Sequence, residues 1–189
     1  MSEIAATPPP IPVVIDNPGD WASIMEELGS RTGSPPTITP ELVAGVVGSA
    51  APLLFAADAA GTSDRLRGTF TDPVIAQVER NFGSFFGERP VSGTVHLVGS
   101  PAGPVPPALR IHLQLLVKSA QGDDGVNSQF WDLAVGSQVT VGDATCPNCG
   151  APLDVNQIGE CRFCKAAVTS GKFDWVLSRI EQAEEVTYA

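Results

Sequence analysis

The chain has 189 residues, of which 43% are hydrophobic and 17% are charged, as expected for a globular protein with one main core. Its formal net charge of −10 argues against nucleic-acid binding and against electrostatic docking on anionic lipid, because both depend on Lys and Arg. The N-terminal residues show no signal-peptide pattern, so we expect a reducing, cytoplasmic environment in which thiols stay reduced.

The N-terminal third predicts a tail followed by two helices. Residues 1–18 are rich in proline and predict a flexible tail. Residues 19–29 predict a short helix that ends at Gly29, because apolar residues recur at helical spacing: Trp21, Ile24, Met25 and Leu28. A second helix is predicted to about Ala60, with Thr39 as its N-cap and Pro40 at its first position.

The second predicted helix contains the most apolar stretch of the chain, residues 42–57. This stretch is shorter than the ~20 residues that a membrane-spanning helix needs, and it contains Pro52. We expect a buried core helix, with a segment that touches a membrane surface as the alternative.

A third helix is predicted to begin at Thr71 or Asp72, with Pro73 in its first turn. Its buried face would consist of four apolar residues at helical spacing: Val74, Ile75, Val78 and Phe82.

After residue 87 the hydrophobic period changes to two, which predicts strands near residues 91–97, 109–118 and 127–137. Helices followed by an antiparallel sheet indicate an α+β fold. If the first two strands pair with their odd-numbered residues facing the core, the numbers of opposite residues sum to an even value, and a sum of 208 would place His96 opposite His112 on the polar face. We expect two solvated histidines there; a general base or a second metal site is the alternative.

All four cysteines lie in two Cys-x-x-Cys pairs: Cys146, Cys149, Cys161 and Cys164. Two such pairs at this separation predict one zinc ion held in a tetrahedron of four thiolates. A redox pair and disulfide bonds are the alternatives. Four protein ligands leave no open position on the metal, so the ion would be structural rather than catalytic. After the cysteines, a short C-terminal helix is expected, with Asp174 as a candidate cap and five apolar residues: Phe173, Trp175, Val176, Leu177 and Ile180.

The segment CPNCGAPLDVNQIGECRFCKAAVTSGKFDWVLSRIEQ resembles the zinc-ribbon tail of bacterial Tim-forty-four-like proteins, and LRGTFTDPVIAQVE resembles the helical turn before their sheet. The resemblance covers about residues 40–182. It implies a cystatin-like fold, in which helices pack in the concave side of a curved antiparallel sheet. We therefore expect an α+β domain over residues 19–142, then a zinc ribbon and C-terminal helix over residues 143–189.

The sequence contains no nucleophile elbow, phosphate-binding loop or dinucleotide fingerprint. We therefore expect a non-enzymatic binding or scaffold protein, possessing a zinc ribbon and serving a protein partner or an apolar ligand such as an acyl chain. The resemblance adds a transport role and peripheral membrane contact as expectations. The alternative is an enzyme of the cystatin-like superfamily that uses the cavity between sheet and helices as its active site.

The zinc assignment predicts a measurable metal content. Chain purified under reducing conditions should contain one zinc ion, and a chelator should lower its melting temperature, because the ion holds a segment too small to fold alone. Elemental analysis and thermal unfolding with and without chelator measure the two effects. A metal-free chain, or a melting curve that the chelator leaves unchanged, would contradict the assignment.

Overall fold

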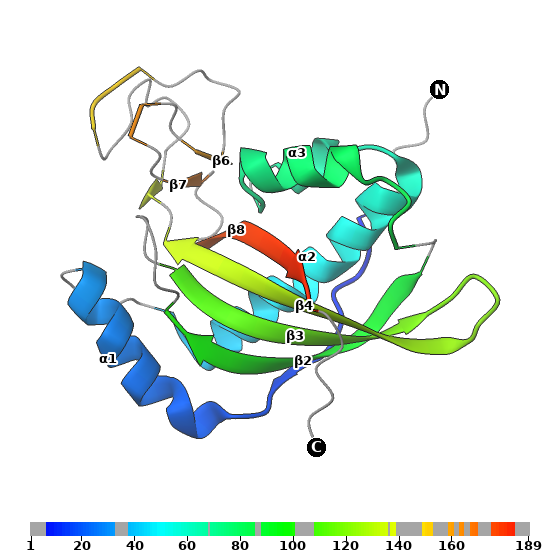
Figure 1. Cartoon of the computed structure of the whole chain (residues 1–189), viewed down its shortest axis with the longest axis horizontal. Helices are drawn as coiled ribbons and strands as arrows, with labels where there is room; N and C mark the ends of the chain where they lie inside the picture. The colour runs from blue at the N-terminus through cyan, green and yellow to red at the C-terminus, as the bar shows by residue number, and fades with distance from the viewer. Residues whose placement is uncertain are drawn as a thin grey trace.

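A five-stranded mixed sheet carries the α+β fold, with the strands in the order β1–β2–β3–β4–β8 (Figure 1). The strands are β1 (Val13–Ile15), β2 (Arg89–Gly99), β3 (Ala108–Lys118), β4 (Asp124–Val135) and β8 (Trp175–Gln182). All neighbours pair antiparallel except β1, which runs parallel to β2. This computed structural model describes residues 7–32, 38–67, 69–85, 88–100, 108–135, 137–138, 149–152, 159–160, 163–164, 167–169 and 175–183.

Three helices and two short 3-10 turns precede the long strands. They are η1 (Pro18–Asp20), α1 (Trp21–Thr32), α2 (Pro40–Ala60), η2 (Asp64–Leu66) and α3 (Asp72–Arg80). A second, small sheet consists of β5 (Ser137–Gln138), β7 (Ala167–Thr169) and β6 (Gly159–Glu160), in that spatial order. The predicted α+β class is confirmed, whereas the predicted order of helices before an antiparallel sheet is not, because β1 precedes the helices and makes the sheet mixed.

The core lies between the helices and one face of the main sheet. Five alternate side chains of β3 are fully buried in this core: Leu109, Ile111, Leu113, Leu115 and Val117. Leu28 of α1, Leu54 of α2 and Val78 of α3 belong to the same cluster, so all three helices contribute to one core. The opposite face, here called the outer face, carries the even-numbered residues of β2 and β3. Strand alternation thus separates an apolar side of the sheet from a polar one.

Helix α2 forms as its local sequence predicts. The Thr39 side chain accepts a hydrogen bond from the Leu42 N–H at 3.2 Å, and Gly61 ends the helix in the left-handed conformation.

Among the described helices, α2 alone is long and apolar enough to span a membrane, and 61% of its most apolar stretch is buried within the structure. Such burial is typical of a core helix.

Helices α1 and α3 differ from their predicted ends. Helix α1 continues through Gly29 to Thr32, and Phe82 lies just beyond the last residue of α3. Thr71 occupies the N-cap position of α3, but its side chain makes no capping hydrogen bond.

The prediction of a flexible tail over residues 1–18 is wrong for residues 11–18. Strand β1 pairs with β2, and the Ile11 N–H donates to the Gly48 carbonyl of α2 at 2.9 Å. Asn17 then bonds the backbone of Leu97 through both its amide nitrogen and its oxygen. The Pro-rich composition gave no indication of strand β1, because this strand is stabilised by pairing with β2, which lies far along the chain.

The predicted C-terminal helix is also wrong, because Trp175–Gln182 forms strand β8 at the edge of the main sheet. The register shifts between Leu133↔Leu177 and Asp132↔Arg179, so Ser178 is the extra residue of a β-bulge. The bulge places Leu177 and Ile180 in the core, three residues apart. A spacing of three is helical, which explains the misreading. The boundary predicted at residue 142 therefore does not separate the C-terminal segment from the sheet.

Gly48 is the point of closest approach between α2 and the N-terminal segment, and it supports a matched pair of variants. A Cβ at Gly48 would lie 2.6 Å from the Ile11 carbonyl oxygen, whereas a Cβ at Gly45 would meet nothing within 4 Å. Gly48→Ala should lower the free energy of unfolding by about 1–3 kcal/mol, because the N-terminal segment must move off the helix. Gly45→Ala should raise it by about 0.5–1 kcal/mol through helix propensity.

Urea denaturation of the two variants and the unchanged chain measures these differences. Equal stabilisation by both substitutions would show that the N-terminal segment does not pack on α2.

Candidate functional site

A cleft of about 270 Å³ opens between α2, α3 and β8. Its floor is made of four buried apolar side chains: Leu54, Val78, Phe85 and Ile180. Its polar lining consists of Asp58 and four uncharged residues: Gln77, Asn81, Ser84 and Gln182. An apolar floor with a few polar groups is the usual composition of a small-ligand site.

One carboxylate fixes the outer wall of the cleft. Asp58, in the last turn of α2, is only 3% exposed. Its Oδ1 accepts hydrogen bonds from Gly83 N (3.0 Å), Ser84 N (3.2 Å) and Ser84 Oγ (3.2 Å), and its Oδ2 accepts one from Phe85 N (3.1 Å). Gly83 adopts a φ of +84°, which lets the loop turn its amides toward the carboxylate. The loop after α3 is therefore held to the end of α2.

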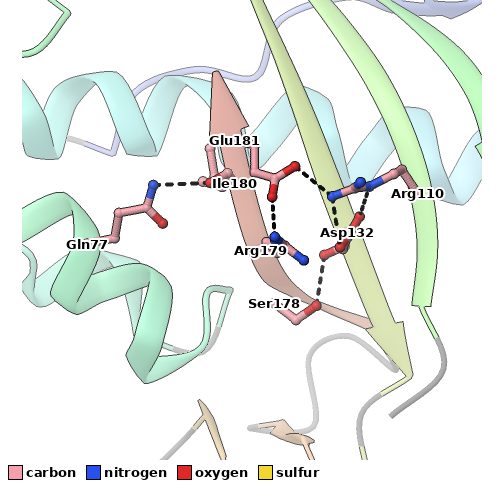
Figure 2. A network of polar contacts seen from close by, with 7 residues as sticks. All are labelled: Gln77, Arg110, Asp132, Ser178, Arg179, Ile180 and Glu181. Carbon is pink, nitrogen blue, oxygen red and sulfur yellow. Dashed lines mark hydrogen bonds and ion pairs between the residues drawn. The ribbon is translucent and has the colours of Figure 1, made fainter. Parts of the chain in front are cut away.

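The same loop places an aromatic ring in the floor of the cleft. The Phe85 ring stacks on Phe55 of α2, with ring centroids 4.2 Å apart. On the opposite side, the Gln77 amide donates to the Ile180 carbonyl at 3.1 Å and ties α3 to β8 (Figure 2). The cleft thus lies between elements that are linked by directional bonds.

Chemically, the cleft can hold an apolar group and hydrogen-bond to whatever this group carries. Asp58 is its one titratable residue among the described lining, and both carboxylate oxygens already accept hydrogen bonds from the loop. Three of the four uncharged polar residues already use one donor within the protein: Gln77 donates to the Ile180 carbonyl, Asn81 to the Gln77 carbonyl and the Ser84 hydroxyl to Asp58. Each side-chain amide still has a second N–H and a carbonyl oxygen, and the Ser84 oxygen can accept a hydrogen bond. This arrangement favours binding over proton transfer.

One feature of the sequence, the position of Asp58, could have indicated this site, although it belongs to no known motif. Asp58 is an isolated carboxylate at the end of a long apolar helix, where the helix dipole disfavours negative charge and the last turn has no basic residue. A residue that contradicts its local context in this way often has a role elsewhere in the fold. The uncharged residues around it carry no such signal.

The predicted pairing of His96 with His112 is confirmed by the register of β2 and β3. The two residues line a second cavity of about 270 Å³ on the outer face, together with Asp16, Thr94 and Gln114. His96 Nδ1 lies 2.9 Å from Asp16 Oδ1, with both side chains about half exposed, and His112 Nε2 lies 2.7 Å from Ser128 Oγ.

His112 is not the solvated residue that the sequence predicted, because it is only 4% exposed. Its ring stacks on Phe130 with centroids 4.8 Å apart. Burial lowers the pKa of His112 below its ordinary value and the charge of His96 lowers it further, whereas Asp16 opposes part of the shift. The protonated form of His112 is therefore disfavoured relative to an exposed histidine, and the expectation of two solvated histidines holds for His96 alone.

Beyond the histidines, ion pairs cross the outer face from β3 to β8 (Figure 2). Arg110 Nε lies 2.7 Å from Asp132 Oδ1, and Arg110 Nη2 lies 2.9 Å from Glu181 Oε2. Arg179 pairs with Glu181 from the same strand, and Ser178 in the bulge donates to the Asp132 carbonyl. These contacts hold the edge strand β8 in register.

The described residues include half of the predicted zinc ligands. Cys149 is exposed and Cys164 is partly buried, whereas Cys146 and Cys161 lie outside the described residues. Gly150, directly after Cys149, has a φ of +71°, a left-handed conformation that glycine adopts readily in a tight turn. Within the described ranges no three His, Cys, Asp or Glu residues form a metal-binding group. The four-thiolate site therefore stays a prediction, to which the donor set and the turn at Gly150 are suited.

Comparison with known proteins finds no matching family model, no matching curated protein and no matching solved structure.

The role of Asp58 can be tested by substitution. Asp58→Ala should lower the free energy of unfolding by about 3 kcal/mol or more, because three backbone N–H groups lose their acceptor. Asp58→Asn, which keeps one acceptor oxygen, should lose less. Asp64→Ala, at an exposed position, should change stability by less than about 0.5 kcal/mol. Denaturant unfolding measures all three, and equal effects of Asp58→Ala and Asp64→Ala would contradict the anchoring role.

Proposed function

We propose that the protein is a non-enzymatic binding module that takes an apolar group into the cleft between α2, α3 and β8. The observation that carries this proposal is the composition of the cleft, which combines four buried apolar side chains with four uncharged polar residues and the hydrogen-bonded Asp58. A volume near the lower end of ligand pockets suits a short apolar chain or one side chain of a protein partner.

The alternative is an enzyme of the cystatin-like superfamily with its active site between sheet and helices. Such an enzyme needs a titratable group that can reach a substrate. Among the described residues of the cleft, Asp58 is the candidate for such a group. Its carboxylate oxygens already accept hydrogen bonds from the loop after α3, so Asp58 serves to hold this loop in place. In the sheet-facing core, Gln129 is fully buried and bonds Asn127 and the Trp131 indole. These hydrogen bonds favour the binding module.

The cystatin-like arrangement and the zinc ribbon belong to the same proposal. A curved sheet with α2 across one face supports the first (Figure 1). For the second, we propose that Cys146, Cys149, Cys161 and Cys164 hold one structural zinc ion, and that the ribbon steadies the β4–β8 connection. The resemblance to Tim-forty-four-like proteins supports both.

We further propose a cytoplasmic place of action, because the four thiols must stay reduced to bind zinc. The burial of α2 favours its role in the core over contact with a membrane surface.

Binding in the cleft can be tested with octanamide, a short apolar chain with a neutral head. The full-length chain with zinc retained should bind it, with NMR shift changes at Val78, Phe85 and Ile180. Gln182→Trp should weaken binding at least ten-fold, because an indole at this exposed rim position obstructs the cleft. Calorimetric titration measures the affinities.

The matched control is Val126→Trp, which adds the same ring at a strand position that is 71% exposed and outside the cleft. It should leave the affinity unchanged. Absence of binding, or equal loss in both variants, would contradict the proposal.

A further inference from the structure

We propose that the cleft selects its ligand by head group: it takes an apolar chain with an uncharged amide or hydroxyl head, and discriminates against carboxylate and ammonium heads. This inference rests on the proposed function of the cleft and adds the chemical class of its ligand.

The rim of the cleft is the first observation. Gln77, Asn81, Ser84 and Gln182 present amides and a hydroxyl, and no described Lys or Arg lines the cleft. Gln77 and Asn81 each use one N–H within the protein, on the carbonyls of Ile180 and Gln77. The second N–H and the carbonyl oxygen of each side chain match the two halves of a primary amide. A carboxylate can use only the donors, and an ammonium can use only the acceptors.

The state of Asp58 is the second observation. Its carboxylate repels an anionic head from inside the cleft, and the net charge of −10 adds to this repulsion. It is also a poor counter-ion for an ammonium, because the loop supplies four hydrogen bonds to its two oxygens and it is only 3% exposed. An ammonium would have to compete with these bonds.

The cost of removing charge from water completes the argument. An ion that enters a partly apolar site without a partner loses hydration that nothing replaces, whereas a neutral amide can exchange its water hydrogen bonds for those of the rim. Both charged heads therefore lose affinity relative to the neutral head on the same chain.

The experiment compares octanamide, octanoate and octylammonium at pH 7 by calorimetric titration of the full-length chain with zinc retained. Octanamide should bind at least ten-fold more tightly than either ion. N-acetyl-leucinamide serves as a stand-in for a partner's side chain and should bind more weakly than octanamide.

Two variants of one exposed rim residue then change the preference in opposite directions. Gln182→Lys should raise the affinity for octanoate about two- to five-fold relative to octanamide, and Gln182→Glu should do the same for octylammonium. Gln121→Lys adds the same charge on the β3–β4 turn, which projects away from α3, and should change neither ratio (Figure 1).

The outcomes separate the two proposals. If no ligand shifts the resonances of the cleft residues, both the proposed function and the head-group inference are overturned. If octanoate or octylammonium binds as tightly as octanamide, or the Gln182 variants leave the ratios unchanged, the head-group inference fails and the binding cleft stands. Tighter binding of N-acetyl-leucinamide would assign the cleft to a peptide and overturn the small-ligand inference.

Discussion

The pairing of β8 with β4 is the contact on which the rest of the structure depends. It brings the last described segment of the chain back to the main sheet, from Val135↔Trp175 to Gln129↔Gln182. It places Leu177 and Ile180 in the core and forms one wall of the cleft. The free edge of β8 is then occupied, because Leu177 exchanges backbone hydrogen bonds with Thr69 and Thr71, and Gln77 bonds the Ile180 carbonyl. An edge covered in this way is protected from pairing with another chain.

The anchor at Asp58 shows how a locally unfavourable residue can organise a site. A buried carboxylate at the negative end of a helix dipole is costly by itself. The N–H groups of the loop after α3 offset this cost and in return become fixed. One side chain therefore determines the end of α2, the course of the loop and the position of the Phe85 ring. The cleft depends on this arrangement, because Phe85 forms part of its floor.

The features that could be predicted from the sequence are those that local chemistry decides. The Thr39 cap, the extent of α2 and the alternation of β3 follow from neighbouring residues. Strand parity places His96 and His112 on the same face, whereas their opposition depends on the register between β2 and β3, which parity alone does not determine. Strand β1 could not be predicted, because its three residues gain their structure from β2, some 80 positions away. Strand β8 was misread because one bulge at Ser178 converts a period of two into a spacing of three. A cavity between sheet and helices was expected from the resemblance, but the residues that line the cleft could not be predicted, because they come from separate elements.

The two ends of the segment between β4 and β8 meet at one pair of residues, Val135 and Trp175. A segment whose two ends are neighbouring residues of a sheet can be exchanged as one unit. Its internal sequence can diversify, lengthen or be replaced by a graft from another protein, provided that the two strand ends are preserved. The main sheet would keep its strand connectivity, so the segment between β4 and β8 could acquire new binding properties without any change in the core.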